Sequence, residues 1–222
     1  MKLILDTANI KKIEDYLTYL PVEGVTTNPS ILKQEGKIDV VQHMKEIRHL
    51  IGADKSLHVQ VVQDSYEGII EDTHKILDSI DSDVFIKIPV SKAGLKAIKR
   101  LKEEGVNITA TAIYSTIQAL LAMELGSDYL APYVNRMQNL NTCPYNVIQT
   151  VSNQIAETGS KSRIVAASFK NIDQVVKATE YGASHVTVGV DVLDTFLANA
   201  NIQKAVDDFA NDWQAIHNKK AF

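Results

Sequence analysis

The chain has 222 residues, of which 45% are hydrophobic and 23% are charged, a composition typical of one globular domain. Its formal net charge of −4 argues against a nucleic-acid-binding protein, which needs a broad basic face to displace counterions. A single cysteine, Cys143, excludes an intrachain disulfide and fits a reducing compartment.

Short apolar, β-branched segments alternate with longer segments of helical period, and this alternation recurs eight times. Asp6 follows the first apolar segment too closely for a signal peptide, and no run of about 18 apolar residues could cross a membrane. We therefore expect a cytoplasmic protein with no membrane partner. The predicted strands cover residues 3–5, 24–26, 58–62, 84–88, 108–112, 129–133, 163–167 and 185–188.

Helix-start signals lie between these strands. Asp64 with Glu67 and Ser115 with Gln118 have capping-box spacing, so each pair predicts the first turn of a helix. Pro144 suits the first turn of another helix, because a proline there loses no helical hydrogen bond.

Strands that alternate with helices predict parallel pairing through right-handed crossovers. Eight such units in about 200 residues fit a closed barrel better than an open doubly wound sheet. The competing dinucleotide-binding fold needs a glycine-rich turn after the first strand, and the turn Asp6-Thr7-Ala8-Asn9 has no glycine. We predict an α/β protein: one domain over residues 1–222, a single (β/α)₈ TIM barrel with an extra C-terminal amphipathic helix.

The C-terminal helix is predicted over residues 201–217. Its apolar residues recur at steps of four and three, which makes a narrow apolar seam. The seam can pack against the helix's own barrel or on a neighbouring subunit of a homo-oligomer. The residues of the seam are Ile202, Val206, Phe209, Trp213 and Ile216.

The carboxyl ends of the predicted strands carry polar residues. A barrel of this kind places its functional groups at that end, where a purely structural core would not tolerate them. Their recurrence on successive strands, more than any one residue, predicts a site there. The set is Asp6, Thr26, Asn28, Gln60, Lys87, Thr109, Thr111, Tyr133, Asn135, Arg136, Ser168, Thr187 and Asp191.

Lys87 lies within an almost entirely apolar strand. Side chains alternate along a strand, so Ile86 and Ile88 share one face while Phe85 and Lys87 share the other. If the isoleucines pack under the helices, Lys87 points into the barrel. Burial lowers the pKa of a lysine and leaves a neutral amine that can attack a carbonyl. The alternative is a lysine that pairs with an inward carboxylate such as Asp6.

Other residues are weaker candidates. His58 shares a strand face with Gln60 and is either a base or a hydrogen-bonded core residue. His185 opens a strand and is expected near the opposite end of the barrel. No His, Cys, Asp or Glu grouping has metal-ligand spacing, and no glycine-rich phosphate loop occurs. We therefore expect neither a metal nor an organic cofactor.

With these residues in view, the sequence resembles the transaldolase family, in particular its fructose-6-phosphate aldolase branch. The likeness runs over essentially the whole chain through motifs in the family's order. These are Leu5-Asp6-Thr7, Gly24-Val25-Thr26-Thr27-Asn28-Pro29-Ser30, Ile86-Lys87-Ile88-Pro89-Val90, Ala131-Pro132-Tyr133-Val134-Asn135-Arg136-Met137, Ala166-Ala167-Ser168-Phe169-Lys170 and the pair Asp212-Trp213.

The resemblance implies a (β/α)₈ barrel in which the fourth strand carries a Schiff-base lysine, which is where Lys87 falls. It implies roles for other residues as well. Asp6 would bond substrate hydroxyls and assist proton transfer, and Asn28 with Thr26 would orient the sugar. Arg136 and Ser168 would hold a phosphate. Thr111 takes a family role too, and Thr109 joins it as a substrate-binding candidate from its place on the same strand.

Two positions separate the branches of this family. Transaldolases carry a glutamate where this chain has Gln60 and a phenylalanine where it has Tyr133, so the chain resembles the aldolase branch. Tyr133 could pass protons through a water that Gln60 positions. The implied activity is that of a class I aldolase, a carbon–carbon lyase of carbohydrate metabolism. It would reversibly cleave fructose 6-phosphate into dihydroxyacetone and glyceraldehyde 3-phosphate.

The closest alternative is a transaldolase that transfers the dihydroxyacetone unit between sugar phosphates. A non-catalytic phosphate-binding barrel is a further one, although it would leave Lys87 without a purpose. Relatives in the aldolase branch form decamers of two pentameric rings in which the terminal helix reaches a neighbour. The resemblance therefore implies a homo-oligomer of this kind.

Overall fold

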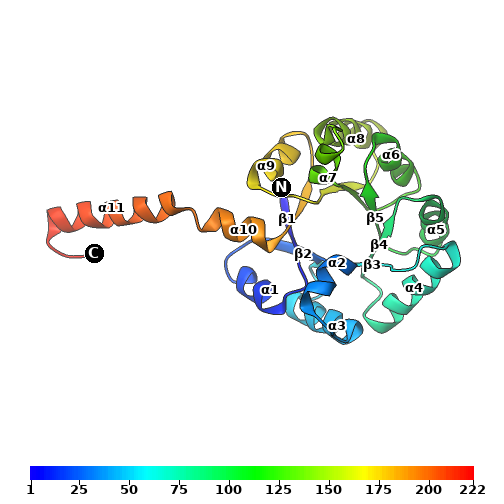
Figure 1. Cartoon of the computed structure of the whole chain (residues 1–222), viewed down its shortest axis with the longest axis horizontal. Helices are drawn as coiled ribbons and strands as arrows, with labels where there is room; N and C mark the ends of the chain where they lie inside the picture. The colour runs from blue at the N-terminus through cyan, green and yellow to red at the C-terminus, as the bar shows by residue number, and fades with distance from the viewer.

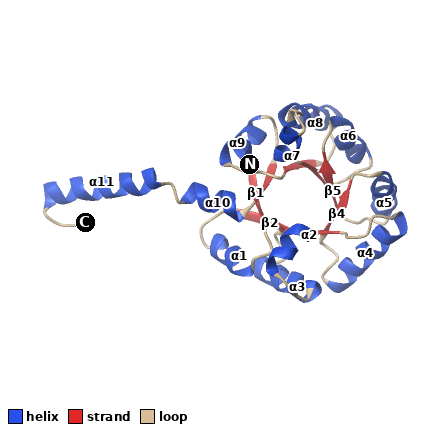
Figure 2. Cartoon of the chain, in the orientation of Figure 1, coloured by secondary structure: helices blue, strands red, loops and turns tan.

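The computed structural model describes residues 1–222, and its eight parallel strands close into a barrel in chain order (Figures 1 and 2). The predicted (β/α)₈ architecture is thus confirmed. Each strand pairs with the next, and β1 pairs with β8 to close the ring. The strands are β1 Lys2–Asp6, β2 Val22–Thr26, β3 Ser56–Gln60, β4 Phe85–Pro89, β5 Ile108–Ile113, β6 Tyr129–Pro132, β7 Arg163–Ala166 and β8 His185–Val188.

Helices surround the barrel, and the short α2 and α7 lie closer to its axis than the helices of the outer ring (Figure 1). In no helix do length and apolar content together reach what crossing a bilayer requires. The helices are α1 Ile10–Leu17, α2 Pro29–Leu32, the 3₁₀ turn η1 Lys33–Glu35, α3 Val40–Ile51, α4 Tyr66–Ser79, α5 Lys92–Glu103, α6 Thr116–Glu124, α7 Val134–Asn139, α8 Pro144–Thr158, α9 Ile172–Glu180, α10 Val190–Leu197 and α11 Ala200–His217.

Two apolar cores follow from the alternation of side chains along the strands. The larger core has 44 buried residues and lies between the strands and the helices. A smaller core inside the barrel is built by Ile4, Tyr129, Ala131 and Val165, with Phe85 packed against it. This inner core fills the barrel as packed side chains do in folds of this type. Polar groups inside the barrel therefore gather toward its two ends.

The third strand is shorter than the sequence pattern predicts. It ends at Gln60, and Val62 beyond it is 77% exposed. The main-chain N–H groups of Val62 and Gln63 donate to the carboxylate of Asp72, at 2.7 and 2.8 Å, and not to a neighbouring strand. A side chain of α4 thus ends the ladder, which the local pattern of apolar residues could not indicate.

The capping box predicted at Asp64 is wrong by one residue. Ser65 is the N-cap of α4, and its hydroxyl accepts from the N–H of Gly68 at 3.0 Å. Both residue types cap helices well, so their order in the sequence does not decide between them. Pro144 does occupy the first turn of α8, as predicted.

Ser115 and Gln118 do interact at the start of α6, but not through the hydrogen bonds of a capping box. Ser115 is the N-cap of α6, but its hydroxyl donates to Gln118 at 3.1 Å and accepts no main-chain N–H. The same amide oxygen of Gln118 accepts from the N–H of Tyr114 at 2.9 Å. Gln118 therefore holds the residue that precedes the cap.

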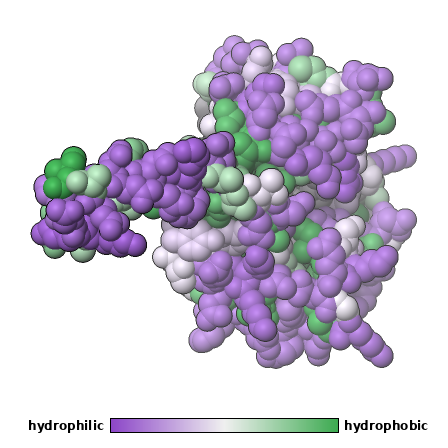
Figure 3. Space-filling model, turned by 60° about the vertical axis from the view of Figure 1, so that its left-hand side comes forward, coloured by the Kyte–Doolittle hydropathy of each residue, from purple (hydrophilic) through white to green (hydrophobic).

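α11 extends away from the barrel instead of packing against it (Figure 1). None of its residues is buried, and Phe209 and Ile216 of the predicted seam are 72% and 74% exposed. The bounds of this helix are correctly predicted to within one residue. The alternative in which its seam packs on its own barrel is wrong. Apolar side chains of this projection lie at the surface in the space-filling view (Figure 3).

Candidate active site

Lys87 points into the barrel from β4 and is only 5% exposed. Ile86 and Ile88 on either side belong to the outer core, as the alternation predicted. The ammonium Nζ donates one hydrogen bond, of 2.9 Å, to the main-chain oxygen of Thr27 and forms no salt bridge. Burial lowers the pKa of Lys87, and the negative charge of Asp6 opposes that shift. The alternative of a lysine paired with Asp6 is therefore wrong for this structure.

Asp6 ends β1 on the inner face of the barrel. Its carboxylate accepts from the hydroxyl of Thr26 at 2.7 Å, and that hydroxyl meets the hydroxyl of Thr187 at 2.5 Å. Burial raises the pKa of Asp6, whereas the charge of Lys87 and the bond from Thr26 act to lower it. An acid with a raised pKa and an amine with a lowered pKa thus share one end of the barrel, and such perturbed groups mark a candidate functional site.

Tyr133 lies just beyond β6 and joins this group through a hydrogen bond of 2.9 Å between its hydroxyl and that of Thr111. Burial raises the pKa of Tyr133, which the bond to Thr111 partly offsets. The phenol form is therefore favoured near neutral pH. Such a hydroxyl can donate a proton or relay one, but it is a poor standing base.

An irregular strand presents Thr111 to Tyr133. The pairing of β5 with β6 shifts register after Ala110, and Ala112 has a φ of 55°, in the left-handed region that alanine disfavours. The bulge turns the end of β5 just after Thr111. Nothing in the sequence marks Ala112 for this conformation, because glycine or asparagine would be the expected residue there.

Gln60 ends β3 in register with Lys87 on β4. Its amide oxygen is buried and has no hydrogen-bond partner within the chain. A buried acceptor without a partner is costly, so it marks a place where a water or a ligand hydroxyl would donate.

Three further predicted residues surround the same end of the barrel. Asn28 caps α2, and its amide oxygen accepts from the N–H groups of Ser30 and Ile31, which leaves its NH₂ group available. Ser168 follows β7 with a φ of 63°. Arg136 on α7 is exposed and takes part in no salt bridge, so its charge is available to an anion.

Thr109 is buried, and its hydroxyl bonds a histidine of the neighbouring packing. Its hydroxyl is bonded to Nδ1 of His58 at 2.8 Å, and Nε2 of His58 meets the hydroxyl of Ser56 at 2.9 Å. His58 stacks on Phe85 and is fully buried, so the structure has the hydrogen-bonded core histidine and not an accessible base. Thr109 is in register with Lys87 on β4, but its hydroxyl is engaged by His58.

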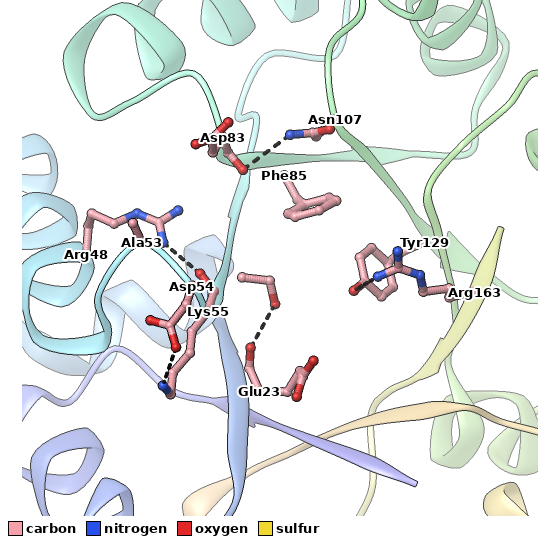
Figure 4. A pocket seen from close by; sticks show the side chains of 11 residues that line it. Glu23, Arg48, Ala53, Asp54, Lys55, Asp83, Phe85, Asn107, Tyr129 and Arg163 are labelled. Atoms are coloured by element: carbon pink, nitrogen blue, oxygen red, sulfur yellow. Dashed lines mark hydrogen bonds and ion pairs between the residues drawn. The ribbon is translucent and has the colours of Figure 1, made fainter. Parts of the chain in front are cut away.

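A polar pocket of about 300 Å³ lies at the amino-terminal end of the barrel, opposite Lys87 (Figure 4). Phe85 and Tyr129 of the inner core are among the residues that line it, and the guanidinium of Arg163 donates to the hydroxyl of Tyr129 at 2.8 Å. None of the predicted site residues lines it. The packed inner core therefore separates this pocket from the polar group around Lys87.

Sequence reasoning missed three contributors to the site. The main-chain oxygen of Thr27 binds Lys87, the bulge at Ala112 presents Thr111, and the hydroxyl of Tyr114 accepts from Arg136. No residue type encodes the first two. Tyr114 could have been found, since it follows the same strand as Thr111. No group of three or more His, Cys, Asp or Glu side chains is arranged to hold a metal ion.

Comparison with known proteins gives consistent matches over the full chain. A family model described as transaldolase/fructose-6-phosphate aldolase matches residues 3–221. The chain is 51% identical over 221 residues to a probable fructose-6-phosphate aldolase from Streptococcus pneumoniae, covering 100% of both chains. It is 32% identical to a probable transaldolase from Methanococcus maripaludis, covering 99% of this chain and 100% of that one.

A further probable transaldolase, from Clostridioides difficile, is 32% identical over 96% of this chain and 97% of its own. Among solved structures, the inosine 5'-monophosphate dehydrogenase of Legionella pneumophila matches with a TM-score of 0.60 and 16% identity. That match covers 86% of this chain and 58% of the dehydrogenase, so this chain spans little more than half of it. At such low identity the likeness concerns the barrel fold alone.

Proposed function

The chain belongs to the transaldolase/fructose-6-phosphate aldolase family, and from this premise we propose that it is a class I aldolase. It would cleave fructose 6-phosphate reversibly into dihydroxyacetone and glyceraldehyde 3-phosphate. Membership of the family indicates an enzyme that acts on sugar phosphates. The choice of lyase over transferase, and of Lys87 as the nucleophile, is our proposal.

The observation that carries the proposal is the environment of Lys87. Its amine is nearly inaccessible to bulk solvent, has a lowered pKa and is free of any salt bridge. A neutral amine held at the carboxyl end of a barrel is a competent nucleophile toward a ketone. A purely structural lysine would be paired with a carboxylate.

The proposed reaction begins when Nζ of Lys87 adds to the C2 carbonyl of the ketose. Loss of water then gives an iminium ion, which withdraws electrons from C3. Removal of the proton from the C4 hydroxyl breaks the C3–C4 bond, and glyceraldehyde 3-phosphate leaves. The enamine that remains takes a proton at C3. Water then adds to the iminium and releases dihydroxyacetone, which regenerates the amine.

We assign proton transfer to three polar groups at the carboxyl end of the barrel: the Tyr133–Thr111 pair, Gln60 and Asp6. The pair Tyr133–Thr111 and the unpartnered oxygen of Gln60 support a water that relays the proton of the C4 hydroxyl. Asp6, with its raised pKa, would assist this transfer and bond substrate hydroxyls. A positioned acid–base group of this kind contributes about 10²–10⁴ in rate.

Substrate binding is assigned to the polar groups around the mouth of the barrel. Arg136 and the backbone and hydroxyl of Ser168 would hold the phosphate, because a guanidinium makes charge-assisted bonds to phosphate oxygens. Asn28 and Thr26 would orient the sugar hydroxyls. Thr109 is in register with Lys87, but its hydroxyl is bonded to His58, so we assign it an indirect effect on binding.

Trapping with borohydride tests the covalent step. Reduction of the iminium formed with dihydroxyacetone would leave a secondary amine on Lys87, which peptide mass spectrometry detects as an added mass. The Lys87→Met variant is the matched blank. Intact wild-type peptide after treatment, without the added mass, would contradict the covalent mechanism.

Transfer to an acceptor sugar is the second candidate function, favoured by the 32% identity to probable transaldolases. Gln60 and Tyr133 support the aldolase, since a relayed proton lets the enamine be released as free dihydroxyacetone. The deciding assay measures glyceraldehyde 3-phosphate release with and without erythrose 4-phosphate. Release that requires the acceptor would assign the chain to the transaldolases.

We also propose that the chain acts as a homo-oligomer, a decamer of two pentamers by family resemblance, in which α11 docks on a neighbouring subunit. The apolar seam of α11 is exposed in the single chain, and the indole N–H of Trp213 is buried without an acceptor. An apolar pocket of about 420 Å³ beside α10 also lies open, lined in part by Leu20, Val176, Phe196 and Leu197. Apolar surface of this extent is typical of an interface.

A further inference from the structure

The guanidinium of Arg136 is held by two tyrosines and by no acid. It lies over the ring of Tyr133, with 4.7 Å between Cζ and the ring centroid. Its Nη1 donates to the hydroxyl of Tyr114 at 3.3 Å. The two rings contact each other edge to face, with centroids 5.6 Å apart. One tyrosine thus supports the face of the guanidinium and the other its edge.

This support leaves the charge of Arg136 uncompensated. A carboxylate in the place of the Tyr114 hydroxyl would also orient the guanidinium, but it would neutralise the charge and repel a phosphate. A tyrosine hydroxyl accepts a hydrogen bond without carrying a formal charge at neutral pH. The other N–H donors of Arg136 remain available to an incoming ligand.

Tyr114 is itself held in place. Its main-chain N–H donates to Gln118 at 2.9 Å, and the amide group of Gln118 donates in turn to the main-chain oxygen of Val90 at 3.1 Å. The ring is half-buried at the end of β5, and its hydroxyl has no hydrogen-bond partner other than Arg136. The position of Tyr114 is therefore fixed by the barrel, while its hydroxyl serves one contact.

We propose that Tyr114 is a positioning residue that sets the preference for phosphorylated substrates by orienting Arg136. The inference rests on the proposed function, in which Arg136 binds the substrate phosphate. Tyr133 contacts the same guanidinium but also belongs to the proposed proton relay, so its loss would affect several steps. The ring of Tyr114 also contacts the ring of Tyr133, but its hydroxyl bonds only Arg136, so removing that hydroxyl alone should affect selectivity without acting on the reacting atoms.

The test is the variant Tyr114→Phe, which removes one oxygen and keeps the ring. Aldol addition of dihydroxyacetone is measured with glyceraldehyde 3-phosphate and with D-glyceraldehyde as acceptors. We expect the ratio of kcat/KM for the phosphorylated over the non-phosphorylated acceptor to fall by about three- to tenfold, the effect of losing one hydrogen bond of ordinary net strength. The change should lie mainly in KM for the phosphorylated acceptor.

Inorganic phosphate supplies a readout that does not depend on catalysis. In a direct calorimetric titration of the enzyme, inorganic phosphate should bind Tyr114→Phe more weakly than the wild type by a similar factor. If Tyr114→Phe keeps the wild-type ratio of kcat/KM for the two acceptors, whether or not its overall activity falls, the inference is overturned.

The variant Arg136→Gln separates this inference from the function on which it rests. An unchanged acceptor ratio in Arg136→Gln would refute Arg136 as the phosphate ligand and, with it, that part of the proposed function. A ratio that falls in Arg136→Gln but stays unchanged in Tyr114→Phe would overturn the role of Tyr114 alone. A fall in both variants, larger for Arg136→Gln, supports the proposal.

Discussion

At the scale of single residues, the chemistry depends on where each titratable group meets water. Lys87 and Asp6 lie at the same end of the barrel, yet no direct bond joins them. Burial disfavours the charged form of both side chains, which lowers the pKa of Lys87 and raises that of Asp6. The opposite charge of the partner favours the charged form of each and so opposes both shifts. The main-chain oxygen of Thr27 accepts a hydrogen bond from the amine of Lys87. Because this oxygen carries no formal charge, it does not hold the amine in its protonated form as a carboxylate would. The amine can therefore shed a proton that a salt bridge would retain.

The pH dependence of imine formation tests this balance. In the wild type, trapping by cyanoborohydride with dihydroxyacetone should increase with pH as Lys87 loses its proton, with a midpoint below that of an ordinary lysine. Removing the charge in Asp6→Asn withdraws the influence that raises the pKa of Lys87, so the midpoint should move to lower pH. Asp191→Asn is the control, because Asp191 influences Asp6 but not Lys87. A midpoint that is unchanged or higher in Asp6→Asn would contradict the balance of opposing charges.

Tyr133 is the second residue whose role can be isolated. The variant Tyr133→Phe keeps the ring under Arg136 but removes the hydroxyl that bonds Thr111. We expect kcat for fructose 6-phosphate cleavage to fall by about 10² or more, while KM changes by less than about threefold. Steady-state kinetics measure both constants. Tyr181→Phe, at a surface position away from the site, is the control, and equal cleavage by the two variants would remove Tyr133 from proton transfer.

At the scale of elements, two departures from ideal geometry matter most. The bulge near the end of β5 bends that strand after Thr111. The hydroxyl of Thr111 therefore reaches the hydroxyl of Tyr133 on the neighbouring segment. The second departure is α11, which follows α10 and leaves the barrel altogether. α10 is anchored to α1, because Asp194 accepts from the Tyr16 hydroxyl at 2.5 Å and from Nζ of Lys12 at 2.8 Å. The start of α11 therefore has a defined direction.

The exposed seam of α11 leads to a prediction about assembly. Phe209→Asp with Ile216→Asp places two charges on the apolar seam, and we expect the oligomer to dissociate because buried unpaired charges are costly at an interface. Since α11 does not pack on its own barrel, circular dichroism of the double variant should remain that of a folded α/β protein. Light scattering with size-exclusion chromatography gives the mass. Asn211→Asp, on the opposite side of the helix, is the control, and an unchanged mass for the double variant would refute docking through this seam.

At the scale of the whole molecule, the barrel has two polar ends separated by an apolar centre. The carboxyl end holds the group around Lys87, and the amino end holds the pocket shown in Figure 4. Between them Phe85, His58 and Tyr129 pack their rings together, and His185 meets Tyr129 edge on. Two imidazoles are thus part of the inner packing. Their burial links the stability of the barrel to pH.

We expect the free energy of unfolding to decrease as the pH falls from about 6.5 toward 4. Burial lowers the pKa of His58 well below its ordinary value, and burial with the charge of Arg163 lowers that of His185 to about 4. The unfolded chain binds protons at these histidines near pH 6.5, while the folded chain does not, so acid favours unfolding. Each histidine can lower the free energy of unfolding by at most about 1.4 kcal/mol for each pH unit of acidification.

Urea titrations between pH 7 and pH 5 measure this dependence. His185→Gln should show a shallower decrease than the wild type, because one of the two buried imidazoles is gone. His49→Gln changes an exposed histidine of α3 and serves as the control. A wild-type stability that stays constant over this range, or a slope that His185→Gln leaves unchanged, would contradict the prediction.

The sequence alone determined the features that arise from local periodicity. Alternation in β4 is a property of consecutive residues, so the inward direction of Lys87 and the outward direction of Ile86 and Ile88 could be predicted from the order of residues in that strand. The eight-fold recurrence of strand and helix predicted the barrel, and the barrel predicted that the polar strand ends would meet. The steps of four and three in residues 201–217 predicted α11 within one residue.

Only the tertiary structure decided which groups touch. The bond from Lys87 to the main-chain oxygen of Thr27 joins residues 60 positions apart, and a main-chain oxygen has no signature in the sequence. The turn of Thr109 toward His58, the support of Arg136 by Tyr114 and the direction of α11 away from the barrel likewise depend on distant segments. The periodicity of a sequence predicts the face of a helix or strand on which a side chain lies, because the backbone geometry repeats regularly along each element. Contact partners depend on how those faces are brought together, and that is settled by the packing of the whole chain.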